Sequence, residues 1–197
     1  MSIKGNIRKR ISQAEGNEIF FVSDFSTDGN DVFISRLLSE CVADGLIERL
    51  GNGIFYKPIK TKFGNLTPSV DAIVKAIARR DKAEVMPAGE TAEHQLGLSN
   101  QVPMVYMYLT SGSARKIILD NTTIIFKRCV PKNFAYKDEF MPILVQAMKS
   151  IGKDNITSEI TAKIYTLIKE HVNPETYSHD IALAPIWIKK IIRQVNV

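Results

Sequence analysis

Long apolar runs are missing from this sequence of 197 residues. No stretch approaches the roughly 20 consecutive apolar residues that a membrane-spanning helix needs. The start of the chain, Met1–Arg8, has neither a long apolar segment nor a small-residue cleavage site, so we expect no secretory signal. We therefore expect a cytoplasmic protein that has no membrane among its partners.

Cysteine and histidine are scarce, with two and three residues respectively. Cys41 falls on the apolar face of an expected helix and Cys129 at the end of an expected strand, so both should be small core residues in a reducing compartment. The histidines, His94, His171 and His179, show no ligand spacing. Because a metal site requires more ligands at closer spacing, we expect neither a metal nor a cofactor.

An excess of basic charge is present overall but absent from the first third of the chain. The net charge of +5 is compatible with a nucleic-acid partner. Residues 1–60 nevertheless hold eight basic and eight acidic residues, so this segment is neutral. Only local clustering favours a nucleic acid here, because Lys4, Arg8, Lys9 and Arg10 all lie within the first ten residues.

The stretch from Asn30 to Lys57 carries the clearest structural signal. Apolar residues at helical spacing predict a helix that Asn30 or Asp31 caps and that Gly45 ends. Two β-rich runs, Leu46–Arg49 and Ile54–Lys57, then flank Asn52-Gly53, a dipeptide typical of tight hairpins. A helix followed at once by a two-stranded ribbon is typical of a winged helix-turn-helix, which binds DNA.

The remaining pattern predicts an α+β protein with two domains. An N-terminal winged helix-turn-helix domain is expected over residues 1–60. Pro, Gly, Asn and Thr dominate residues 61–68, which predicts a linker. Regular strand pairing is expected to end at Pro58, before this linker. Residues 69–197 alternate helical and strand-like patterns, which predicts a mixed α/β C-terminal domain with a small antiparallel sheet and a helical tail.

Several segments together resemble a known family. They are the N-terminal helix and ribbon, a short helix ending in Leu96-Gly97-Leu98, the strand entry Gln101-Val102-Pro103, and a hairpin ending in Phe126-Lys127-Arg128. This arrangement is similar to the AbiEi-type antitoxins of type IV toxin–antitoxin (abortive infection) systems. The resemblance implies an N-terminal domain that binds operator DNA and represses its own operon. It also implies a C-terminal domain that antagonises a nucleotidyltransferase-like toxin, for which direct contact is not required.

The expected contacts to double-stranded operator DNA fall on three segments. The outward face of the helix offers polar side chains for base edges and phosphates, with Arg36 suited to guanine. Glycines let the ribbon tip approach a phosphate closely, and the N-terminal cations neutralise phosphates. The complete expected set is Lys4, Arg8, Lys9, Arg10, Asn30, Ser35, Arg36, Ser39, Arg49 and Asn52.

Catalysis is not expected. Ser111–Arg115 is superficially similar to the Gly-Ser loop of minimal nucleotidyltransferases, whose chemistry also needs two carboxylates one residue apart to hold Mg²⁺. Here Asp120 is followed by Asn121 and Thr122, so the second carboxylate is missing. A tight turn at Asp120-Asn121 is expected instead.

One alternative function stays open. The chain is then a winged-helix transcriptional regulator, unrelated to toxins, whose C-terminal domain senses a ligand or dimerises. Trp187 and the stripe Ile188, Ile191 and Ile192 would suit a partner surface, although such residues more often form core.

Overall fold

A computed structural model describes residues 2–27, 29–119 and 122–195. The fold is α+β, as predicted, and it divides into two compact units, residues 1–81 and 82–197. Within the described residues, no helix is both long and apolar enough to cross a bilayer.

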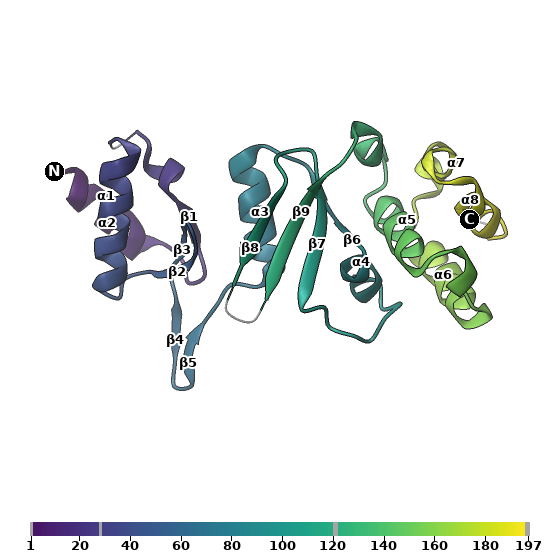
Figure 1. Ribbon diagram of the computed structural model, residues 1–197, viewed down its shortest axis with the longest axis horizontal. Coiled ribbons are helices and arrows are strands. Elements are labelled where there is room, and N and C mark those ends of the chain that lie inside the picture. The colour runs from purple at the N-terminus through teal and green to yellow at the C-terminus, as the bar shows by residue number, and fades with distance from the viewer. Residues whose placement is uncertain (1, 28, 120–121, 196–197) are drawn as a thin grey trace. The chain divides into compact units, whose positions relative to one another are not determined.

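The first unit begins with a helix, a short strand and a second helix (Figure 1). Its elements are α1 (Ile3–Gln13), β1 (Ile19–Phe21), the 3₁₀ turn η1 (Val22–Phe25), α2 (Asp31–Ala43), β2 (Glu48–Gly51), β3 (Ile54–Tyr56), β4 (Ile59–Thr61), β5 (Gly64–Leu66) and α3 (Val70–Asp81). Strands β1 and β2 both pair antiparallel with β3, so the sheet order is β1-β3-β2. A core between α1, α2 and the sheet buries Ile7, Ile11, Ile34, Leu38 and Phe55, among others.

The helical periodicity read from the sequence accounts for α2. Ile34, Leu37, Leu38 and Cys41 are buried, as predicted, while Val42 is only partly buried. Burial also raises the pKa of the Cys41 thiol. The helix ends before Gly45, which adopts a φ of 67° where a side chain would be strained.

Residues 59–66 form a second hairpin, so the expectation that regular pairing ends at Pro58 is wrong. Strands β4 and β5 pair antiparallel, with Ile59 opposite Leu66 and Thr61 opposite Gly64. Proline lacks only its own N–H and fixes only its own φ, so it does not prevent pairing in the next residues. Gly64 takes a φ of 116°, which lets the chain reverse there.

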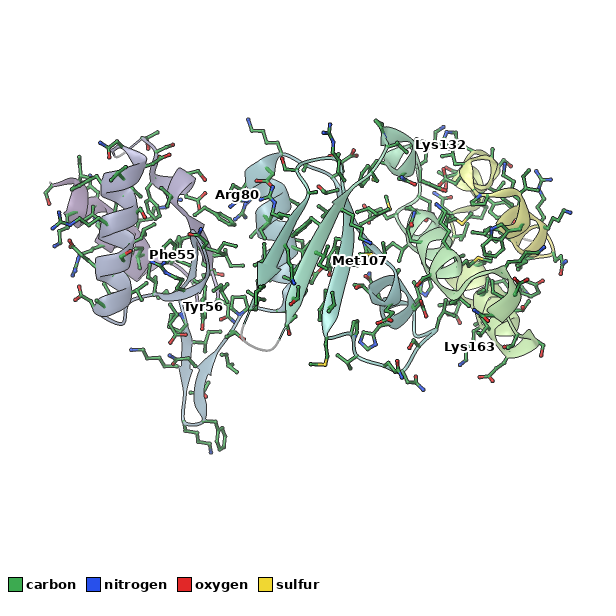
Figure 2. The ribbon with its side chains drawn as sticks, viewed as in Figure 1. Phe55, Tyr56, Arg80, Met107, Lys132 and Lys163 are labelled. Atoms are coloured by element: carbon green, nitrogen blue, oxygen red, sulfur yellow. The ribbon has the colours of Figure 1, made fainter. Side chains whose placement is uncertain are left out.

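The compact first unit continues to Asp81 and includes α3, which the sequence pattern had assigned to the second domain. The Arg80 guanidinium lies 4.4 Å from the centroid of the Phe21 ring on β1 (Figure 2). Arg80 Nε also donates to Asp81 Oδ1 at 2.9 Å. The contact with Phe21 holds the end of α3 to the three-stranded sheet, and the bond to Asp81 orients the Arg80 side chain.

The second unit has a four-stranded sheet followed by helices (Figure 1). Its elements are β6 (Val85–Ala88), α4 (Glu90–Gln95), β7 (Val105–Thr110), β8 (Arg115–Ile118), β9 (Thr123–Arg128), η2 (Pro131–Phe134), α5 (Phe140–Ile151), η3 (Lys153–Asn155), α6 (Ser158–His171), α7 (Pro174–Leu183) and α8 (Ile186–Ile192). The sheet order is β6-β7-β9-β8. Two pairings are antiparallel, as predicted. The third pairing, between β7 and β9, is parallel, so the sheet is mixed and the prediction of an antiparallel sheet is wrong for this pair.

The helical tail has its own core, in which Leu144, Ile164, Ile168 and Ile188 are fully buried. Asp180 is also fully buried. Its carboxylate accepts hydrogen bonds from the backbone N–H groups of Lys137 and Asp138 at 2.9 and 2.8 Å, so this buried acid is satisfied. The predicted helical tail is therefore a packed four-helix segment rather than a set of separate helices.

Candidate nucleic-acid interface

Helix α2 presents a polar face to solvent because its apolar stripe is buried. Asn30 caps the helix, as predicted, by accepting a hydrogen bond from the backbone N–H of Phe33 at 2.9 Å. Ser35, Arg36 and Ser39 are exposed on the opposite face from the buried stripe. The Arg36 side chain is 80% exposed, and its contact with Glu40 is long, at 3.5 Å. The guanidinium of Arg36 is thus available to an incoming ligand.

Arg49 connects the ribbon to this face of α2. Its guanidinium donates to Ser39 Oγ at 3.1 Å and lies 5.1 Å from the centroid of the Phe55 ring. Ser39 Oγ in turn donates to the carbonyl of Ser35 at 2.9 Å. These bonds bring Ser35, Ser39 and Arg49 together beside Arg36, so four of the expected DNA contacts form one surface.

The β2–β3 turn places Asn52 at an exposed position. Gly51 pairs with Ile54, which leaves Asn52-Gly53 as a two-residue turn. The predicted hairpin is confirmed, but only Gly53 adopts positive φ, at 70°. On β3, Phe55 is buried in the core and the hydroxyl of its neighbour Tyr56 donates to Glu48 (Figure 2). The β2–β3 turn therefore extends from a sheet that is anchored by the buried Phe55 and by the hydrogen bond between Tyr56 and Glu48.

Two of the N-terminal cations form ion pairs with α2. Lys4 Nζ donates to Glu40 Oε2 at 2.8 Å, and the Arg8 guanidinium pairs with Asp44. The hydrogen bond and charge of Lys4 lower the pKa of Glu40, with smaller contributions from Arg36 and Arg8. A lowered carboxyl pKa means that the pair is intact at neutral pH and is lost as the pH falls through that pKa. Lys4 and Arg8 thus hold α1 against α2.

The other two cations of the cluster differ from each other. Arg10 donates to the carbonyl of Asp24 at 2.6 Å and lies 4.6 Å from the centroid of the Phe25 ring, so it is engaged within the fold. Lys9 is exposed, and its ammonium has no ion pair or hydrogen bond with any residue that the structure describes. Of the four cations predicted to bind phosphates, Lys9 is the one left unengaged.

Sequence reasoning missed the pairing role of Glu40 and Asp44. Glu40 on α2 and Asp44, the C-terminal cap of α2, are four residues apart, as are Lys4 and Arg8 on α1. This complementary spacing was visible in the sequence, because residues four apart share one helix face.

The second unit contains a groove of about 700 Å³ beside α6 and α8. It is lined by Lys153, Ile156, Thr161, Tyr165, Ile186, Trp187, Lys190, Ile191 and Gln194. Ile188 and Ile192 of the predicted stripe are fully buried core residues. Trp187 and Ile191 instead line the groove. The stripe thus serves both the core and a surface that a partner can reach.

The sheet of the second unit carries the stretch that is superficially similar to a nucleotidyltransferase loop. Of the stretch Ser111–Arg115, residues Ser111–Ala114 form the loop between β7 and β8, and Arg115 begins β8. The expected turn at Asp120-Asn121 lies outside the described residues. Among the described residues, no three His, Cys, Asp or Glu side chains gather as metal ligands would. Cys129, directly after β9, is half-buried rather than a core residue.

Comparison with known proteins places most of the chain in one group. The profile of a family of unknown function (DUF6088) matches residues 6–175, so the chain belongs to that family. No curated protein matches the chain.

Proposed function

We propose that this DUF6088 protein is a DNA-binding autorepressor and antitoxin of the AbiEi type. The observation that supports DNA binding is the element order α1-β1-η1-α2-β2-β3 with the sheet order β1-β3-β2. In the proposal, η1 and α2 form the helix pair of a winged helix-turn-helix and β2–β3 form its wing, a reading that this element order supports. Helix α2 is then the recognition helix.

The exposed face of α2 suits the major groove of duplex DNA. Arg36 supplies a planar guanidinium that fits the two acceptors of a guanine. Val32, whose side chain is 82% exposed in the first turn of α2, supplies an apolar contact of the kind that thymine methyl groups accept. Ser35 donates to a base edge or a phosphate, while Ser39, whose hydroxyl proton is bonded to the carbonyl of Ser35, holds Arg49 beside this face. Arg49, which lies beside this face, and Asn52, in the turn of the wing, contact the DNA backbone.

The affinity of this surface rests on a few placed cations, because residues 1–60 carry no net charge. Lys4 and Arg8 are paired with carboxylates, and Arg10 is bound to a carbonyl. Arg36, Arg49 and Lys9 therefore provide most of the phosphate and base contacts from these segments. A small number of phosphate contacts predicts a moderate dependence of affinity on salt.

The antitoxin role rests on the resemblance carried by the second unit. In the proposal, residues 82–197 antagonise a nucleotidyltransferase-like toxin without chemistry of their own. The stretch Leu96–Pro103, which contains two of the segments that resemble the AbiEi-type antitoxins, connects α4 to β7. Direct contact with the toxin is not part of the proposal.

The groove of the second unit favours a second candidate function. Its volume of about 700 Å³ and its apolar lining around Trp187 match the dimensions of small-molecule sites. A winged-helix regulator that senses a ligand in this groove would also explain the two units. Under that function, no toxin need be involved.

Two experiments separate these functions. The full-length protein is titrated against the duplex upstream of its own gene and against a scrambled duplex of equal length. Tighter binding to the upstream duplex is expected, and equal binding to both would contradict the repressor role. The neighbouring gene is then expressed alone and together with this protein. Growth arrest that this protein relieves supports the antitoxin, whereas a harmless neighbour favours the ligand-sensing regulator.

A further inference from the structure

The hairpin β4–β5 is exposed along its whole length. All six of its strand residues are exposed, and the Phe63 side chain in its turn is 90% exposed. Figure 1 shows the hairpin extending away from the three-stranded sheet of the first unit. An aromatic ring held in water at the end of a projecting hairpin loses the stabilisation that burial would give it. A binding partner that covers the ring would recover that stabilisation.

The turn of the hairpin is held in one conformation. Thr61 Oγ1 donates to the carbonyl of Gly64 at 2.7 Å and accepts from the backbone N–H of Phe63 at 3.2 Å. Lys62 Nζ lies 5.0 Å from the centroid of the Phe63 ring. The ring and its neighbouring cation are thus presented together, which lowers the entropy lost when they bind.

The base of the hairpin is fixed to the body of the first unit. Asn65 Nδ2 donates to Glu48, the first residue of β2. Ile59 packs so closely on Gly16 that a β-carbon at Gly16 would overlap the Ile59 side chain. Pro58, at the entry to the hairpin, is buried. The hairpin is therefore attached to the same sheet that carries the β2–β3 turn.

The charges within residues 49–70 are all basic, and the Glu48 carboxylate is bonded to Asn65 at the base of the hairpin. Residues 49–70 contain Arg49, Lys57, Lys60 and Lys62 and no aspartate or glutamate. Lys57 donates to the carbonyls of Ser12 and Ala14, both at 2.6 Å. Neither Lys60 nor Lys62 forms an ion pair within the part of the chain that the structure describes. The hairpin thus offers two cations and an aromatic ring to a negatively charged ligand.

We propose that β4–β5 is a second DNA-binding hairpin, which deepens and rests on the proposed function. Lys60 and Lys62 neutralise phosphates, and Phe63 inserts into the minor groove as an apolar wedge. Duplex DNA suits this combination, because minor-groove proteins pair cations on the backbone with apolar side chains inserted at base steps. An acidic protein surface would satisfy the lysines but would not require a single projecting ring.

The test is the binding of full-length variants to the fluorescently labelled upstream duplex over a range of salt concentrations. Phe63→Ala is expected to bind about tenfold more weakly, in the range measured for aromatic contacts with bases. The double variant Lys60→Ala/Lys62→Ala is expected to reduce the magnitude of the salt slope by about 1.8, since each phosphate contact contributes about 0.9. Matched controls are Ile118→Ala, an exposed apolar residue on β8, and Lys116→Ala/Lys127→Ala, which removes the same charge from the second unit.

The outcomes distinguish this proposal from the proposed function. If the wild type and the Arg36→Ala variant differ in affinity while the hairpin variants match the wild type, the hairpin proposal alone is overturned. If the wild type binds no duplex, both fall. Hairpin variants that keep DNA affinity but lose binding to the product of the neighbouring gene would assign the hairpin to a protein partner and overturn the DNA role. Because Phe63 is 90% exposed, the melting temperature of Phe63→Ala should equal that of the wild type, which checks folding.

Discussion

At the scale of single residues, replacing a paired cation of α1 should have a different effect on DNA binding from replacing an unpaired one. Lys9→Ala should reduce the magnitude of the salt slope of DNA binding by about 0.9, because it removes one phosphate contact. Lys4→Ala should leave that slope unchanged and should slightly lower the melting temperature, because Lys4 is paired with Glu40. The measurement is fluorescence anisotropy over a range of salt concentrations, with thermal melts alongside. Equal slopes for Lys4→Ala and Lys9→Ala would show that the Lys4 pair opens on binding.

Tyr136 links the stability of the helical tail to alkaline pH. Burial, with a smaller contribution from the charge of Asp180, raises the pKa of Tyr136 to about 12. In the unfolded chain a tyrosine loses its proton near pH 10. Between about pH 10 and 12 the unfolded state therefore releases a proton that the folded state keeps, so the free energy of unfolding falls as the pH rises. This contribution is fully present below pH 10.

The variant Tyr136→Phe should flatten this alkaline loss of stability. Urea unfolding measured from pH 8 to pH 11.5, beside the wild type, tests the expectation. Tyr106→Phe is a matched control, because it removes a tyrosine hydroxyl from a strand of the same unit. An unchanged pH dependence in Tyr136→Phe would contradict the assignment to this hydroxyl.

At the scale of elements, the N-terminal cap of α2 affects both stability and recognition. Asn30→Ala removes the hydrogen bond to the backbone N–H of Phe33 and should cost about 1 kcal/mol of stability. DNA affinity should fall as well, because the first turn of α2 carries part of the proposed surface. Chemical denaturation and duplex titration measure the two effects.

Asn30→Ser separates the two roles of this residue, since serine also caps helices well. It should retain most of the stability. If Asn30→Ser also retains DNA affinity, the residue acts as a cap. If affinity alone is lost, the amide reads the DNA directly, as the sequence first suggested.

The sequence predicted those elements whose signals are local. Periodic apolar residues marked α2, and Asn52-Gly53 marked the β2–β3 turn. The hairpin β4–β5 was missed, because its residues are exposed on every side and so show no apolar alternation. A strand that buries neither face leaves only weak signals, here the β-branched Ile59 and Thr61 and the glycine at position 64.

The candidate surface was predicted in part for a related reason. Exposed residues on α2 follow from helical geometry, so Ser35, Arg36 and Ser39 could be identified from sequence alone. The contacts of Lys4, Arg8 and Arg10 are with residues 14 to 36 positions away, and such pairings depend on how elements pack. Charge counts therefore overstated the number of cations available to DNA.

At the scale of the whole molecule, substitutions in one unit should impair the function of that unit and leave the function of the other unit intact. In the antitoxin proposal, Arg36→Ala/Arg49→Ala abolishes repression but leaves rescue from the toxin intact, because rescue depends on residues 82–197. A reporter fused to the upstream region measures repression, and growth during toxin expression measures rescue. The control Arg193→Ala removes an exposed cation from the second unit and should keep repression. Simultaneous loss of repression and rescue in a folded Arg36→Ala/Arg49→Ala protein would contradict this division.

The central claim is that the first unit binds duplex DNA through α2 and the β2–β3 ribbon. It is tested most directly by the affinity of full-length Arg36→Ala for the duplex upstream of its own gene, beside the wild type and Arg193→Ala. The loss expected for an arginine that contacts a guanine is about 1–3 kcal/mol, with a matching loss of preference over a scrambled duplex. An affinity and a preference equal to those of the wild type would remove α2 from the interface and contradict the account.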